Sequence, residues 1–252
     1  MCLLRAGVSE VVGYLLILSI TVCIISVIYA GGMPIIEQTR ENAAFKSMEN
    51  AFIAMQKSIE KVAFGQSPSL SFKLNLAKGS VSTKRVAGNI TIIGSFGSSS
   101  HTFGSIEYTL GSRKIIYENG AVIEYSPGGS IIISEPPIFF ANYTGKTHIF
   151  ISVINVSGDF SAGGGTTEML FRQNDPRNDT DIIYNGSTSS NCVNISISSS
   201  YIYAWVNYLN NYFKEEAKEC DVTYEMQNGE VNICCSTPIN ITLVVHNVTV
   251  SG

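Results

Sequence analysis

An uninterrupted apolar run stands near the start of this chain. Val11 to Ala30 form 20 residues without a charge, VVGYLLILSITVCIISVIYA. At about 1.5 Å of rise per residue, roughly 20 apolar residues in a helix match the ~30 Å hydrocarbon core of a bilayer. The pattern therefore predicts a helix that lipid or other apolar segments can surround on all sides.

A second helical pattern, with one apolar face, follows the run. Gly31, Gly32 and Pro34 predict a kink or break between the two. An apolar stripe then follows, whose residues are three or four positions apart: Phe45, Met48, Phe52, Met55, Ile59 and Val62. The opposite face is expected to carry Glu41, Lys46, Glu49, Gln56, Lys57, Glu60 and Lys61. The stripe predicts that a helix over residues 8–64 packs onto a globular head or onto the same helix of neighbouring subunits.

Short strand-like segments replace the helical pattern after Gly65. They are rich in β-branched and aromatic residues and cover 71–76, 89–93, 105–110, 114–117, 121–125, 130–134 and 147–156. Asn119-Gly120 predicts a hairpin, because this dipeptide readily takes the two positive φ angles of a type I′ turn. We expect an antiparallel meander of about seven strands that covers the helical stripe or folds as a sandwich.

The last third of the chain combines loops, a helix and strands. Ser161 to Gly165 predicts a flexible spacer, and Gln173 to Gly186 a polar loop. A second helix is expected over Tyr201 to Lys218, capped by Ser198 to Ser200, with Trp205 as a packing anchor rather than a ligand-stacking residue. Two strands, 230–234 and 239–250, end the chain. The predicted class is therefore α+β, a long N-terminal helix followed by a mainly antiparallel β head over residues 65–252.

The charged residues and the cysteines indicate which partners and which compartment suit this head. Only 14% of residues are charged, the net charge is −4, and no cluster of Lys and Arg occurs, which argues against a nucleic-acid partner. Four cysteines lie beyond the apolar run, and they predict two disulfides in an oxidising compartment. A bond between neighbours would be strained, so Cys192 and Cys220 are each expected to bond one of the adjacent pair Cys234 and Cys235. The alternative, a zinc site of four thiolates, lacks the usual paired spacing.

Sequons of the form Asn-x-Ser/Thr lie only after the apolar run. They predict an exported, glycosylated head with candidate acceptors Asn89, Asn142, Asn155, Asn178, Asn185, Asn194, Asn240 and Asn247.

No catalytic or cofactor pattern stands out. His101, His148 and His246 are far apart in sequence and match no catalytic or metal-binding motif. The Ser58-x-x-Lys61 spacing falls within the amphipathic helix and is attributed to chance. The Asp and Asn residues of 174–181 do not follow a calcium-loop spacing and predict a solvated loop. We expect neither enzymatic activity nor a metal or cofactor.

The segment before the apolar run carries a family resemblance. Arg5-Ala6-Gly7, then Val8-Ser9-Glu10-Val11-Val12-Gly13 and the apolar run, resembles an archaeal type IV prepilin. The resemblance covers about 5–64 and implies a leader over residues 1–7. A prepilin peptidase would cut after Ala6 or after Gly7, so Arg5, Ala6, Gly7 and Val8 are the candidate cleavage residues.

The same resemblance gives Glu10 a role in assembly. In pilins an early Glu is thought to pair with the N-terminal amine of a neighbouring subunit. A plainer interpretation places Glu10 at the headgroup level, where it favours the helix N-terminus.

Three functions remain open from the sequence. The first is a large or minor subunit of a pilus-like surface filament that resides in the membrane before assembly and partners other pilin subunits. The second is a single-pass membrane-anchored extracellular binding or adhesion protein that does not polymerise. The third is a secreted hydrolase released by a cut after Ala30.

Overall fold

The computed structural model describes residues 4–95, 97–143, 146–174, 180–187 and 191–252. Helix α1 spans Leu4–Ala63 without interruption, so of the kink or break predicted at Gly31, Gly32 and Pro34 the break does not occur. A helix tolerates an internal proline at the loss of one backbone hydrogen bond. The chain divides into two compact units, residues 1–45 and 46–252. The second unit thus begins within α1.

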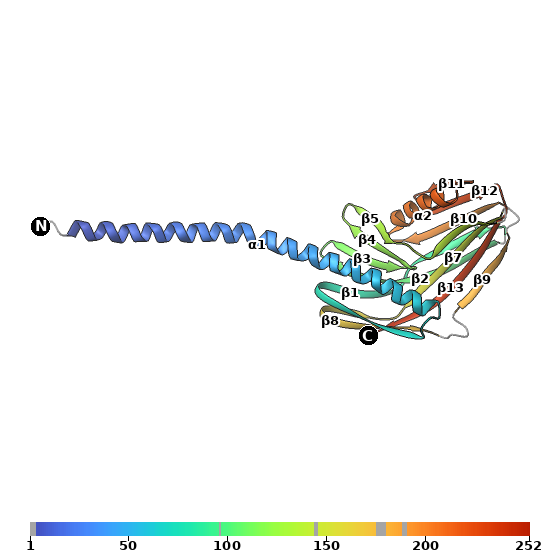
Figure 1. Cartoon of the computed structure of the whole chain (residues 1–252), viewed down its shortest axis with the longest axis horizontal. Helices are drawn as coiled ribbons and strands as arrows, with labels where there is room; N and C mark the ends of the chain where they lie inside the picture. The colour runs from blue at the N-terminus through green and yellow to red at the C-terminus, as the bar shows by residue number, and fades with distance from the viewer. Residues whose placement is uncertain (1–3, 96, 144–145, 175–179, 188–190) are drawn as a thin grey trace. The chain divides into compact units, whose positions relative to one another are not determined.

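The rest of the chain is an α+β head, as predicted. Its strands, shown as arrows in Figure 1, are β1 Ser69–Gly94, β2 Gly97–Leu110, β3 Arg113–Glu118, β4 Ala121–Ser126, β5 Gly129–Ser134, β6 Ile138–Tyr143, β7 Lys146–Ser157, β8 Ser161–Gln173, β9 Thr180–Ser187, β10 Cys192–Ser199, β11 Cys220–Glu225, β12 Glu230–Cys235 and β13 Ile239–Ser251. A second helix, α2, spans Ile202–Glu216.

The sheet begins as the predicted meander and then departs from it. Strands β1 to β5 are sequential neighbours, in the order β5-β4-β3-β2-β1. The order continues β8-β13-β7-β6, with β13 parallel to β7 and antiparallel to β8. Strand β1 pairs with β8 through its first half and with β10 through its second half. The expected seven strands correspond to β1 to β7, but only β1 to β5 form a meander, because β8 and β13 lie between them and the pair β7 and β6.

Two segments expected to be loops are strands. Ser161 to Gly165, expected to be a spacer, begins β8 and pairs with β1 across a shift in register between Leu76 and Ser80. Gly164 and Gly165 have φ angles of 72° and 77°, which suit this irregular pairing. The expected loop over 173–186 contains most of β9, which pairs with β13. A polar or glycine-rich segment can still form a strand when a neighbouring strand is available, because the hydrogen bonds between strands are made by backbone groups.

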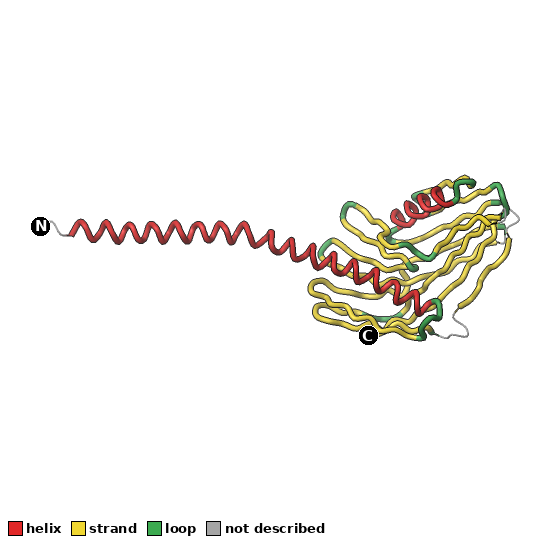
Figure 2. The backbone as a smooth tube through the Cα atoms, viewed as in Figure 1, coloured by secondary structure: helices red, strands yellow, loops and turns green. Residues whose placement is uncertain are grey.

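The two helices cover different faces of the sheet. Trp205 and Phe213 of α2 belong to a buried cluster that includes Ile116 and Ile123 on β3 and β4. Tyr117, next to Ile116 on β3, is also buried but does not belong to this cluster. Glu60 of α1 lies near enough to Tyr117 for its charge to raise the pKa of the phenol. Successive strand residues point to opposite faces, so α1 and α2 lie on opposite sides of β3 and β4. Figure 2 shows the last turns of α1 lying across the strands.

The apolar stripe of α1 packs onto the head within the same chain. Met48, Phe52, Met55, Ile59 and Val62 are at most 3% exposed. Beyond the end of the helix, the Phe64 ring meets the His246 ring of β13 edge to face, with centroids 5.1 Å apart. Of the two alternatives that the stripe left open, the structure shows packing onto the head.

Helix α2 agrees with the sequence prediction to within two residues at each end. Trp205 is fully buried and donates its indole N–H to Glu118 Oε1 at 2.5 Å, which makes it a packing anchor. The predicted serine cap is wrong, because Tyr201 is the N-cap residue and makes no side-chain cap bond. Ser199 Oγ instead accepts the N–H of Tyr201 and donates to Glu118 Oε1.

Two disulfides staple three neighbouring strands. One joins Cys192 of β10 to Cys234 of β12, and the other joins Cys220 of β11 to Cys235 of β12. Each pair lies directly opposite in its antiparallel register. Adjacent strand residues point to opposite faces, so Cys234 and Cys235 reach different partners. Each single cysteine takes one of the adjacent pair, as expected.

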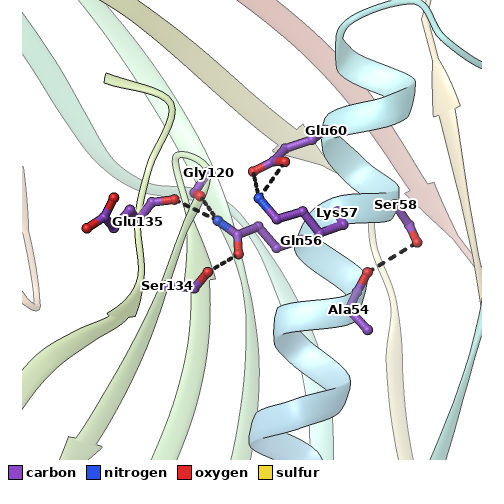
Figure 3. A network of polar contacts seen from close by, with 8 residues as sticks. All are labelled: Ala54, Gln56, Lys57, Ser58, Glu60, Gly120, Ser134 and Glu135. Atoms are coloured by element: carbon purple, nitrogen blue, oxygen red, sulfur yellow. Dashed lines mark hydrogen bonds and ion pairs between the residues drawn. The ribbon is translucent and has the colours of Figure 1, made fainter. Parts of the chain in front are cut away.

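Gln56 is the main polar contact between α1 and the strands. Its Nε2 donates to the carbonyl oxygens of Gly120 at 2.7 Å and Glu135 at 2.8 Å, and its Oε1 accepts from Ser134 Oγ (Figure 3). The residue is fully buried, so its expected place on the polar face is wrong. Gln56 lies one turn from both Phe52 and Ile59, at the edge of the stripe, where its amide matches backbone groups that water cannot reach.

The turn that Gln56 contacts is the predicted Asn-Gly hairpin. Asn119 and Gly120 have φ angles of 46° and 78°, as a type I′ turn requires. The turn is buried, and Asn119 Oδ1 accepts the N–H of Ile154 on β7 at 3.1 Å. A Cβ on Gly120 would lie 2.4 Å from Pro137 Cδ, so glycine is needed for space as well as for φ.

Replacing Gln56→Leu leaves two buried carbonyl groups without a donor. Because an unsatisfied buried acceptor costs ~1–3 kcal/mol, we expect the free energy of unfolding of the full chain in detergent to fall by that amount or more. Chemical denaturation followed by Trp205 fluorescence measures it. The neighbouring Lys57→Ala, which removes only the exposed pair with Glu60, should cost less than about 0.5 kcal/mol. Equal losses in both variants would contradict the anchoring role.

Reduction of the disulfides should loosen β10 to β12 and leave α1 intact. The two bonds close loops of 42 and 15 residues, and a loop of ~15 residues is worth about 3 kcal/mol in the chain-entropy account. Hydrogen exchange of the full chain, with and without reductant, should show faster exchange over residues 192–235. Unchanged exchange in that segment once both bonds are reduced would refute the stapling role.

Candidate functional site

The apolar half of α1 is the most extensive exposed apolar surface in the described part of the chain. Every residue from Val11 to Ala30 is exposed, and no charge occurs between Glu10 and Glu37. The largest exposures include Tyr14 at 75% and Val27 at 73%. Among the residues that the structure describes, one helix is long and apolar enough to cross a membrane. Exposed apolar surface of this extent marks an interface with lipid or with protein.

The serine and threonine hydroxyl groups of this segment are satisfied within the helix. Ser19 Oγ donates to the carbonyl oxygen of Leu16 at 2.9 Å, and Ser26 Oγ donates to that of Val22 at 2.7 Å. Thr21 Oγ1 lies 2.8 Å from the carbonyl oxygen of Leu18. In a hydrocarbon environment each unsatisfied polar group costs several kcal/mol, so these internal bonds make the segment compatible with a dry apolar surrounding.

Polar residues bound the apolar surface on both sides. Glu10 is exposed immediately before it, and Glu37, Arg40 and Glu41 follow it. Tyr14 and Tyr29 are both exposed and lie near the two ends of the apolar run. Aromatic side chains near the ends of an apolar span suit the interface between hydrocarbon and water.

The candidate cleavage residues lie in the first turns of α1. The backbone of 5–8 is helical, and the side chains of Arg5, Ala6, Gly7 and Val8 lie outside the described residues. Cys23, the free cysteine of the described part, is exposed on the apolar surface.

The structure separates the candidate glycosylation acceptors by environment. Asn142 on β6 is exposed, and its Nδ2 donates to Glu219 at the surface. Asn155 and Asn194 use their Nδ2 groups within the sheet, Asn155 toward Asn247 and Asn194 toward Asn232. Asn89 and Asn240 are half-buried on strands. Asn178 and the side chain of Asn185 lie outside the described residues. Asn142 is therefore the best-placed of the described acceptors.

The three histidines and Ser58 lie in separate local environments. His101 on β2 contacts Ser99, His148 on β7 lies 3.4 Å from Asn240, and His246 faces Phe64. Ser58 Oγ donates to the carbonyl oxygen of Ala54 (Figure 3). No group of three or more potential metal ligands occurs among the residues that the structure describes. The Asp residues at 175 and 179 and the side chain of Asp181 are not among them.

A buried carboxyl group, Glu118, was not anticipated from the sequence. It is 1% exposed at the end of β3, and Ser199 Oγ and Trp205 Nε1 both donate to Oε1. Burial raises the pKa of Glu118 to about 6, against the opposing effect of these two donors. A perturbed carboxyl often marks an active site. Here both hydrogen-bond donors belong to the anchoring of α2, so the group is structural.

Glu118 should make folding depend on pH. Its pKa is higher in the folded state than in the unfolded chain, so its stabilising contribution is complete below pH ~4.5. The contribution is lost as the pH rises through about 6. Raising the pKa of Glu118 from 4.5 to about 6 corresponds to about 2 kcal/mol.

We expect Glu118→Gln to abolish this dependence in denaturation curves at pH 4.5 to 7.5, because glutamine keeps an oxygen acceptor for Trp205 but does not titrate. The exposed Glu225→Gln is the matched control and should retain the slope of the parent chain. A parental slope in Glu118→Gln would disprove the assignment.

Comparisons with known proteins give a family and a relative. A protein of Archaeoglobus fulgidus, described as "Uncharacterized protein", is 28% identical over 191 residues, which are 67% of this chain and 71% of the relative. No solved structure matches. The model of a family described as "Family of unknown function (DUF7289)" matches residues 6–251. Because this match spans nearly the whole chain, the protein belongs to the DUF7289 family.

Proposed function

We propose that this chain is a structural subunit of an archaeal type IV pilus-like surface filament. The leader over residues 1–7 is removed, the apolar half of α1 first sits in the membrane, and the same surface then packs against the helices of other subunits. The head stays outside for adhesion or contact. The observation that carries the proposal is that every residue from Val11 to Ala30 is exposed on a helix whose continuation is buried in the head.

The two halves of α1 support different parts of this role. Residues 46–63 are fixed to the head by the buried stripe and by Gln56. Residues 11–30 make no buried contact and are apolar on all sides. Moving a large apolar side chain from water into an apolar environment lowers the free energy by about 1.5–3 kcal/mol, so this surface is expected to be covered by lipid or protein. Packing against the equivalent helices of other subunits would remove this apolar surface from water without lipid.

The head supports an extracellular location in this proposal. Two disulfides suit an oxidising compartment, and Asn142 is an exposed acceptor for a glycan. The proposal gives the chain no enzymatic role. Its partners are a prepilin peptidase, the membrane before assembly and other pilin subunits, and the proposal assigns to Glu10 the pairing with the N-terminal amine of a neighbour.

The alternative is a membrane-anchored extracellular binding protein that does not polymerise. It is favoured by the length of the apolar run, which matches a bilayer. Both functions use the same helix and head. They differ in the N-terminus of the finished protein and in the state of the chain outside the membrane.

The mature N-terminus and the assembly state test the proposal together. Expressed in an archaeal host that has a prepilin peptidase, the chain should be sheared from cells as filaments, and intact mass spectrometry should show a terminus at Gly7 or Val8. Gly7→Trp should block cleavage and filament formation, because a bulky side chain no longer fits the small-residue cleavage position. Gly13→Ala, inside the helix with free space at its Cβ, should be processed normally.

Three results would overturn it. An intact Met1 in membrane-bound material, with no filaments, supports the static anchor. Normal processing of Gly7→Trp refutes the cleavage position. A soluble polypeptide that begins at Gly31 refutes the role of the apolar helix altogether.

A further inference from the structure

A cleft of about 450 Å³ lies between strand β5 and helix α2. The two elements lie beside each other at one edge of the sheet (Figure 1). Its volume falls within the ~300–1,000 Å³ range of small-molecule sites. The disulfides and the Glu118 contacts lie outside its lining.

One row of α2 gives the cleft aromatic walls. Tyr208 and Tyr212 are one turn apart, and their rings stack with centroids 5.7 Å apart at an interplanar angle of 18°. Tyr212 is fixed by the backbone N–H of Phe140, which donates to its hydroxyl at 3.1 Å. The hydroxyl of Tyr208 is buried and has no hydrogen-bond partner. Burial raises the pKa of both phenols, so both keep their protons and remain donors.

A second row of α2 lines the cleft with planar polar groups. Asn207, Asn211 and Glu215 follow one another at steps of four and are exposed, and Glu135 comes from the end of β5. Residues four apart lie on one helix face, so the row extends along the cleft for about 12 Å at 1.5 Å per residue. The row offers both donors and acceptors, because carboxamides provide both and carboxylates accept.

The charges of the lining restrict the ligand. Glu135 and Glu215 are both carboxylates, and no lysine, arginine or histidine of the described residues lines the cleft. Phosphate, sulfate and acidic sugars would meet like charge without a compensating cation. A ligand that suits the lining is uncharged, elongated and rich in hydroxyl groups, with apolar faces that can rest on tyrosine rings.

We propose that the cleft between β5 and α2 binds a neutral saccharide chain. The C–H faces of the sugar rings would pack on Tyr208 and Tyr212, and their hydroxyls would bond Asn211, Glu215 and Glu135. The unpartnered hydroxyl of Tyr208 supplies a further donor to an adjacent sugar oxygen when side chains adjust around the ligand. This inference concerns the head alone and does not depend on whether the chain polymerises.

Binding can be measured on the full chain in a detergent without a sugar headgroup, such as a zwitterionic amine oxide, because a glycoside detergent would itself compete. Isothermal titration and saturation-transfer NMR with maltotriose, mannotriose and chitotriose are expected to identify at least one ligand. Asn211→Ala and Glu215→Ala, both at exposed positions, should each weaken binding about tenfold. Tyr208→Ala should abolish it.

Tyr203→Ala is the matched control, because Tyr203 is a tyrosine on the same helix, 62% exposed and outside the cleft. It should bind as the parent chain does. Trp205 fluorescence verifies that each variant keeps α2 packed, and the two exposed variants decide the outcome where Tyr208→Ala does not fold.

Four results would overturn the proposal. They are the absence of binding to all three neutral trisaccharides, equal binding by the cleft variants and the parent, preferential binding of a sialylated or sulfated sugar, and cleft-dependent binding of a basic peptide without any sugar binding. Filament formation is measured separately, so a failure here leaves the assembly proposal standing.

Discussion

Gln56 and the buried Asn119-Gly120 turn connect the helix to the sheet. The Gln56 amide satisfies the carbonyl of Gly120 and that of Glu135, while Asn119 accepts a hydrogen bond from β7. These groups are closed off from water, so each must find its partner within the protein. The apolar stripe provides most of the burial, but many helix rotations and shifts could bury apolar residues. The three directed bonds of Gln56 select one of them, which fixes the register of α1 on the strands.

The two halves of α1 follow from one change in pattern along a continuous helix. From Val11 to Ala30 the helix is apolar on every side and exposed, and after residue 45 one face is buried. A surface helix of a globular head needs only a single stripe, whereas a segment surrounded by lipid or by other helices has no polar face to present. The internal bonds of Ser19, Thr21 and Ser26 satisfy the serine and threonine hydroxyls of the apolar half. One part of α1 can therefore pack onto the head while its apolar half is surrounded by lipid or by other helices.

The opposite face of the sheet is organised around α2. Trp205 and Ser199 both bond the buried Glu118, and the disulfides of β10, β11 and β12 constrain the strands beside the helix. Constraint of a small edge region by cross-links reduces the freedom of its unfolded state. With its buried face fixed by these contacts, α2 can present the other side, including Tyr208 and Asn211, to the cleft with β5.

The sequence by itself determined the long apolar helix, the stripe from Met48 to Val62 and the second helix, because each rests on the spacing of apolar residues. It also determined the Asn119-Gly120 hairpin, because that turn rests on a local φ preference. The strain of a bond between the adjacent Cys234 and Cys235 also limited the disulfides, since each of these two then needs a partner elsewhere. Only the tertiary structure decided the rest. It buried Gln56 and Glu118, made β8 from a glycine-rich segment and set β13 parallel to β7. These outcomes depend on partners distant in sequence, whose hydrogen bonds and packing no local pattern records.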